Sequence, residues 1–288
     1  MFRCLHEIQV GLEYPKAIAV DSDGNLYVGC CGYNGGLQRF AKDASPFGYK
    51  SDFTLTIGKI MGVAVNHNGL VYVTRKADTH EVRAYTSDGA MWKAWGRCGA
   101  EIGEFCTPTG IACDDDGNVY VIEASSWPSV PYMDTWVAGG NRLQKFDGEG
   151  AYQNGWGTYG FDEGCFNVPV GIAVGRNNHI YVADTYNSRI QAFNANGRFL
   201  LQWGQLGEGK KQFNNPQGVA ADINGDIYVA DTYNNRVQHF NADGEFISAF
   251  GTEDDFWLPC GIAVDEYNNL FVADTMRHRI LIYANASE

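Results

Sequence analysis

Acidic and basic residues recur in pairs along the chain. Such residues could form buried ion pairs, or the acidic ones could bind a cation. The pairs are Asp184 with Arg189, Asp231 with Arg236, Asp274 with Arg279, Glu123 with Arg142, and Arg75 with Glu81. In the last pair the two charges have exchanged places, yet opposite signs remain together. We interpret the pairs as ion pairs that brace a loop, because buried charges persist when they are paired. A calcium site made by the three aspartates is the alternative.

The cysteines and histidines show no metal-binding spacing. The chain has eight cysteines and six histidines, and no Cys-x-x-Cys sequence occurs. Six cysteines fall in segments that we expect near one rim of the fold: Cys30, Cys31, Cys98, Cys106, Cys165 and Cys260. Free thiols packed as small hydrophobic groups and a redox-active or soft-metal surface both remain open. We therefore assign no metal, cofactor or catalytic residue.

These residues are positioned by a repeat that fills the chain. Its core is Pro-x-Gly-Ile/Val-Ala, a turn, and Tyr-Val-Ala-Asp-Thr. Copies begin at Pro15, Ile60, Pro108, Pro169, Pro216 and Pro259. A repeat of this length built from short strands predicts propeller blades or another repeat array rather than an ordinary globular domain.

One unit, residues 166–204, predicts four strands. Gly171–Val174 is short and apolar, as expected of a buried inner strand. His179–Ala183, Arg189–Phe193 and Arg198–Trp203 follow after turn sequences, and together they form an antiparallel meander. The apolar faces of such a sheet need a neighbour on each side, so the array must close into a ring.

The chain ends predict how the ring closes. The last unit, 256–283, stops after three strands, and residues 1–11 resemble the fourth strands of other units. We predict an all-β protein, one six-bladed β-propeller domain over 1–288 with four antiparallel strands in each blade. The N-terminal strand is expected to complete the last blade.

The motif Phe-x-x-Pro-x-Gly-Ile/Val-Ala, followed by Tyr-Val-Ala-Asp-x-x-Asn-x-Arg-Ile/Val-Gln-x-Phe, resembles the NHL repeat. The match is nearly complete from Trp203 to Phe240. The resemblance implies a six-bladed β-propeller. It does not imply one function, because proteins similar to this include protein-binding scaffolds, RNA-binding domains, sensor domains and lyases.

Net charge and hydropathy limit the classes of partner that the chain can bind. The formal net charge of −13 argues against nucleic acid, and no stretch approaches the length of a membrane span. The first residues lack the features of a signal peptide, so we expect a cytoplasmic protein if Met1 is the native start.

Departures from the repeat indicate a binding surface. Val121 and Leu143 are 22 residues apart, where the regular unit has 8, and the insertion carries several large side chains. The candidate binding residues in the insertion are Trp127, Tyr132, Met133 and Trp136. The glycine-rich loop of the first unit adds Cys30, Cys31 and Tyr33. Long loops in compact domains are often functional.

We therefore predict a non-enzymatic scaffold that binds a protein partner through the rim of inter-blade and strand 2–3 loops. The alternative is a metal-dependent lyase, a hydrolase-like enzyme or a small-molecule binder, with its site at the mouth of the central channel. Lyases with similar propellers hold a metal with histidines around the channel. None of the six histidines here falls in a Gly-Ile-Ala-Val segment.

Overall fold

The structure is a computed structural model of the chain. It describes residues 2–9, 11, 13–43, 45, 48–76, 79–124 and 140–285.

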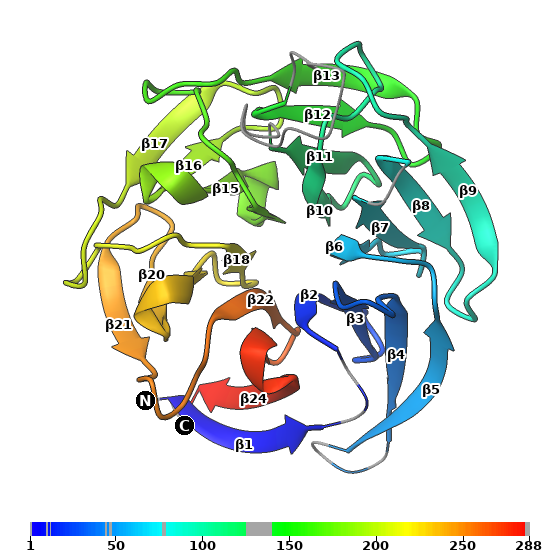
Figure 1. The fold of residues 1–288 in the computed structure, drawn as a ribbon. Helices are drawn as coiled ribbons and strands as arrows, with labels where there is room; N and C mark the ends of the chain where they lie inside the picture. The colour runs from blue at the N-terminus through cyan, green and yellow to red at the C-terminus, as the bar shows by residue number, and fades with distance from the viewer. Residues whose placement is uncertain are drawn as a thin grey trace.

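Six four-stranded antiparallel sheets surround a central axis (Figure 1). From the axis outward, the first blade has β2 (Pro15–Val20), β3 (Leu26–Cys30), β4 (Leu37–Lys42) and β5 (Tyr49–Leu55). The second has β6 (Ile60–Val65), β7 (Val71–Arg75), β8 (Glu81–Tyr85) and β9 (Met91–Trp95). The third has β10 (Pro108–Cys113), β11 (Val119–Glu123), β12 (Arg142–Phe146) and β13 (Tyr152–Trp156).

The later blades add a short 3-10 turn after the second strand, and the fourth blade has another between its first and second strands. The fourth blade has β14 (Gly171–Val174), β15 (Ile180–Asp184), β16 (Arg189–Phe193) and β17 (Phe199–Trp203), with η1 (Arg176–Asn178) and η2 (Thr185–Asn187). The fifth has β18 (Gly218–Ala221), β19 (Ile227–Asp231), η3 (Thr232–Asn234), β20 (Arg236–Phe240) and β21 (Phe246–Phe250). The sixth has β22 (Pro259–Val264), β23 (Leu270–Asp274), η4 (Thr275–Arg277) and β24 (Arg279–Asn285), and it is completed by β1 (Phe2–Ile8).

Strand β1 closes the ring. It pairs antiparallel with β24, and Cys4 lies opposite Tyr283 while Ile8 lies opposite Ile280. The two chain ends consequently lie side by side in one sheet (Figure 1). The all-β, six-bladed fold and its N-terminal closure are confirmed.

The hydrophobic core is divided into six clusters, and each lies between two neighbouring blades. Between the first and last blades, for example, Leu26 and Phe40 pack with Ile280 and Ile282. Burial of apolar surface therefore occurs between sheets, as the repeat predicts, because one blade has no core of its own.

The glycine of the Pro-x-Gly motif lets neighbouring inner strands approach closely. A Cβ atom on Gly218 would lie 2.0 Å from the carbonyl oxygen of Cys260, and one on Gly171 would lie 2.2 Å from that of Gln217. Both distances are far below van der Waals contact, so a side chain at either position would push two blades apart.

Candidate functional site

One face of the propeller carries two sets of loops, and we call it the loop face. It includes the described residues of the inter-blade connections 9–14, 56–59, 96–107, 157–170, 204–217 and 251–258, and the described residues of the loops that join the second and third strands. Antiparallel meanders bring both sets to the same end of every blade, since each strand reverses direction.

Asp184 shows how the buried ion pairs brace this face. Its carboxylate is fully buried and accepts a hydrogen bond from Arg189 Nε at 2.8 Å. It also accepts hydrogen bonds from Asn187 Nδ2 at 2.8 Å and from the backbone N–H of Asn167 at 2.7 Å. Asp231 has the equivalent partners Arg236, Asn234 and Asn214. The predicted loop-bracing role of the pairs is confirmed.

The arginines extend the brace to the preceding inter-blade connection. Arg189 donates to the carbonyl oxygens of Phe161, Asp162 and Cys165 at 2.7 to 2.9 Å. Arg236 does the same for Glu208, Gly209 and Gln212, and Arg142 for Ala100, Glu101 and Glu104. The guanidinium groups thus fix three loops that carry exposed apolar side chains.

The first two blades depart from this arrangement. In the second blade the exchanged pair is formed, with Arg75 hydrogen-bonded to Glu81. In the first blade, Cys30 and Gly36 replace the charged residues and exchange two backbone hydrogen bonds. In the first blade, backbone hydrogen bonds therefore take the place of the ion pair at the base of the loop.

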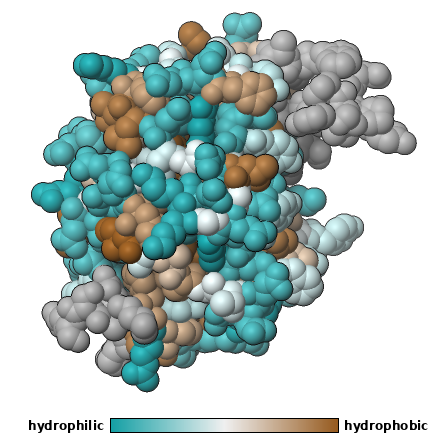
Figure 2. Space-filling view, turned by 90° about the vertical axis from the view of Figure 1, so that its left-hand side faces the viewer, coloured by the Kyte–Doolittle hydropathy of each residue, from teal (hydrophilic) through white to brown (hydrophobic). Residues whose placement is uncertain are grey.

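Large exposed apolar side chains gather on the loop face. Of fifteen in the described part of the chain, nine belong to its loops and two to the turns of the opposite face. The nine are Tyr14, Tyr33, Ile102, Tyr159, Phe161, Tyr186, Leu206, Tyr233 and Trp257. The other four lie on outer strands. Figure 2 shows the side of the propeller that carries β17 and β21, where hydrophobic patches are separated by hydrophilic surface.

Three of the seven predicted binding residues fall in the described part of the chain. Tyr33 is 96% exposed on the loop face, and Cys31 beside it is half-buried. Cys30 is buried in the core cluster between the first and last blades, so it is not exposed on the loop face. The insertion residues Trp127, Tyr132, Met133 and Trp136 lie outside the described residues.

The thiols of the first-blade loop are held protonated. Burial raises the pKa of Cys30 to about 12. Burial also raises the pKa of Cys31, while the nearby Lys16 ammonium acts in the opposite direction. At neutral pH both side chains are therefore thiols, which are weak nucleophiles and weak metal ligands.

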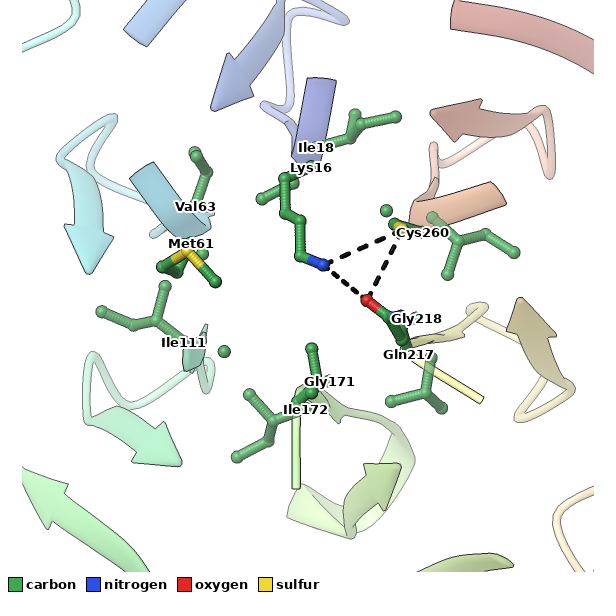
Figure 3. Close-up of a pocket in the computed structure, with 17 residues that line it drawn as sticks. Lys16, Ile18, Met61, Val63, Ile111, Gly171, Ile172, Gln217, Gly218 and Cys260 are labelled. Carbon is green, nitrogen blue, oxygen red and sulfur yellow. Dashed lines mark hydrogen bonds between the residues drawn. The ribbon is translucent and has the colours of Figure 1, made fainter. Parts of the chain in front are cut away.

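A second candidate site lies on the axis, where the residue between Pro and Gly of each repeat faces the channel. Lys16, Met61, Val170, Gln217 and Cys260 occupy this repeat position and line a cavity of about 60 Å³ (Figure 3). This volume accommodates a few water molecules or a small ligand. In the third blade the same position holds Thr109, which instead hydrogen-bonds to Pro169 O and Ile122 O.

Lys16 supplies the positive charge of this cavity. Its ammonium extends from β2 toward the fifth and sixth blades and donates to Gln217 Oε1 (Figure 3). Cys260 Sγ lies 3.9 Å from Lys16 Nζ and 3.5 Å from Gln217 Oε1. Lys16 is not among the site residues predicted from the sequence, although it is a single lysine at a repeat position that is otherwise uncharged.

A serine, a histidine and an aspartate line up on the outer part of the fifth blade. His239 Nε2 lies 2.8 Å from Asp226 Oδ2, and Ser248 Oγ lies 3.4 Å from His239 Nδ1. The imidazole is buried and stacked on Tyr228, with ring centroids 4.5 Å apart. Ser248 is the direct cross-strand neighbour of His239, so the sheet register accounts for this alignment.

In the described part of the chain, no group of three or more His, Cys, Asp or Glu side chains is placed to hold a metal ion. No helix in that part has the length and apolar composition of a membrane span.

The family comparison agrees with the blade geometry. The family model described as the NHL repeat matches residues 166–193 and 213–240, within the fourth and fifth blades. The chain is a six-bladed β-propeller with NHL repeats in its fourth and fifth blades. The resemblance drawn from its sequence motifs is confirmed, although no curated protein sequence gave a significant match.

Several solved structures share the fold of this β-propeller. A streptogramin B lyase is 14% identical, with 98% of this chain and 97% of the other covered and a TM-score of 0.64. A gluconolactonase from Xanthomonas campestris is 15% identical, with 96% and 87% covered and a TM-score of 0.71. A structure of a nidogen/laminin complex is 15% identical, with 92% and 87% covered and a TM-score of 0.64. At these identities the likeness is one of fold.

Proposed function

We propose that this NHL propeller is a non-enzymatic scaffold that binds a protein partner through its loop face. The uneven distribution of exposed apolar side chains carries this proposal: nine lie on the loop face and two on the turns of the opposite face. Aromatic side chains concentrated on one surface are typical of protein interfaces, in which they contribute most of the binding energy.

The braced loops support the same function. Phe161 is exposed, and its carbonyl oxygen accepts a hydrogen bond from Arg189 at 2.7 Å. Its ring also makes an edge-to-face contact with Tyr159. Loops fixed before binding lose less conformational entropy when a partner docks, so the affinity is higher for the same contact area.

Acidic side chains lie among the exposed apolar ones. They are Asp162, Glu163, Glu208, Glu253 and Asp254, all exposed in loop-face connections. We therefore propose a partner that presents an apolar patch bordered by basic residues, because complementary charges steer association and select among partners. The predicted contacts Trp127, Tyr132, Met133, Trp136, Cys30, Cys31 and Tyr33 remain part of this proposal.

Matched variants test the proposal. The tagged propeller is used as bait in an extract of its native host, and co-eluting proteins are quantified by mass spectrometry. Phe161→Ser with Leu206→Ser should release the partner, and so should Trp127→Ala with Trp136→Ala. Ile223→Ser with Tyr267→Ser, on the opposite face, is the control and should retain it. Equal capture by all three variants would contradict binding through the loop face.

A further inference from the structure

The lining of the axial cavity has one charged side chain, Lys16, among its seventeen residues. Both side-chain partners of its ammonium are uncharged, namely the Gln217 amide and the Cys260 thiol. Among the described residues, no carboxylate lies within ion-pair distance of Lys16. A half-buried ammonium without a counter-charge attracts an anion, because the anion recovers part of the hydration energy lost on burial.

Hydrogen-bond donors remain for such an anion. The ammonium has three N–H donors, and its two recorded side-chain partners leave one N–H for a ligand. The Gln217 amide accepts from Lys16 through Oε1, and its Nε2 donates to no acceptor in the described part of the chain. Two donors on adjacent groups match the two oxygens of a carboxylate.

The opposite side of the cavity is apolar. It is lined by Met61 of β6, Ile111 of β10 and the segment Val170–Ile172 at the start of β14. Figure 3 shows the Met61 side chain across the channel from the Lys16 ammonium. A ligand that spans the cavity therefore needs a charged end and a hydrocarbon end.

We propose that the channel mouth binds a small monocarboxylate, with its carboxylate on Lys16 and Gln217 and its short hydrocarbon part against Met61 and Val170. The cavity volume of about 60 Å³ limits the ligand to a few heavy atoms. The net charge of −13 disfavours ligands with several negative charges. The site is formed by the inner strands and by Val170 and Gln217, which end two inter-blade connections, and it does not require the proposed partner.

Methyl NMR of methionine tests the site directly, with sodium butyrate as the probe. The chain has five methionines, of which Met61 lies in the cavity and Met91 is exposed on the outer strand β9. We expect butyrate to shift the Met61 methyl signal saturably and to leave the Met91 signal in place. Butanamide, which has the same shape without the charge, should not shift Met61. A response to butanamide equal to that to butyrate, or no response to butyrate, would overturn the proposal.

Two lysine variants separate the site from general charge effects. Lys16→Met should weaken butyrate binding by about tenfold or more, because a hydrogen bond to a charged group is lost. Lys59→Met removes an exposed lysine of the same face outside the cavity lining and should leave the affinity unchanged. Lys16→Arg keeps the charge and should retain measurable binding, which guards against misfolding as the cause. Full affinity in Lys16→Met would refute the assignment.

A blocked peptide distinguishes a free acid from a carboxylate on a protein. N-acetyl-Ala-Glu-Ala-amide presents one glutamate on a peptide backbone. Because the cavity is narrow, we expect this peptide to shift Met61 less than butyrate at equal concentration. A stronger response to the peptide would overturn the free-acid assignment. Loss of partner capture with butyrate binding intact would affect only the proposed scaffold function.

Discussion

Thr109 Oγ1 donates a hydrogen bond to the carbonyl oxygen of Pro169 at 2.9 Å, and this bond joins the third blade to the fourth. In the fourth, fifth and sixth blades the equivalent bond comes from the threonine that follows the buried aspartate. Thr185, Thr232 and Thr275 donate to Pro216, Pro259 and Pro15 at 2.7 to 2.8 Å. The third blade has Ala124 at that position, so Thr109 provides the missing hydroxyl from the inner strand.

Thr109→Val should therefore destabilise the propeller although the side-chain volume is nearly unchanged. Two buried carbonyl oxygens lose their hydroxyl donor, and we expect unfolding to become easier by about 1–3 kcal/mol. Urea unfolding followed by fluorescence measures the change. Adding Ala124→Thr restores the regular motif and should recover part of the loss. An unchanged free energy of unfolding in Thr109→Val would show that the hydrogen bond makes no net contribution to stability.

Arg189→Ala should have a larger effect, because Asp184 would stay buried without its main counter-charge. Removing one partner of a buried pair costs about 3–5 kcal/mol. Arg198→Ala, an exposed position of the same blade, is the matched control and should change the stability by less than about 0.5 kcal/mol. Equal stability of the two variants in urea would contradict the bracing role.

Removal of residues 1–8 tests the ring closure. The deletion exposes the edge of β24 and the apolar side chains that pack against Ile8 and Phe2. We expect a clearly lower melting temperature by calorimetry. Glu7→Ala removes the half-exposed ion pair with Arg279 and the exposed hydrogen bond from Gln9, and should cost about 0–1 kcal/mol. If the deletion were no worse than Glu7→Ala, β1 would not be a closing strand.

The buried tyrosines make stability fall at alkaline pH. Burial, assisted by the Asp21 carboxylate, raises the pKa of Tyr27 from 10.0 to about 12. Between these values the unfolded chain loses the phenolic proton while the folded state retains it, so the stability conferred by this group decreases as pH rises from 10 to 12. Burial likewise raises the pKa of Tyr49 to about 12.

Tyr27→Phe should therefore flatten part of the pH dependence. Urea unfolding of both proteins at pH 8, 10 and 11.5 measures it. The variant should lose less stability than the wild type between pH 10 and 11.5. Identical losses would contradict the raised pKa of Tyr27.

The architecture could be predicted from the sequence because each blade repeats the same strand and turn signals. The ion pairs could also be predicted from the sequence, since Asp184 and Arg189 have the same spacing as Asp231 and Arg236. Lys16 and Gln217 were not found, because they belong to different repeats and meet only when the ring is closed. Likewise, nothing in the local sequence indicates that Thr109 replaces a threonine at position 124.

Hydrogen–deuterium exchange of the propeller, alone and with its captured partner, tests the scaffold function most directly. Our account predicts slower exchange of backbone amides in the loop-face segments 157–170 and 204–217 when the partner is bound. The turns 194–198 and 241–245 on the opposite face should exchange at unchanged rates. Protection confined to those turns or to the outer strands would contradict binding through the loop face.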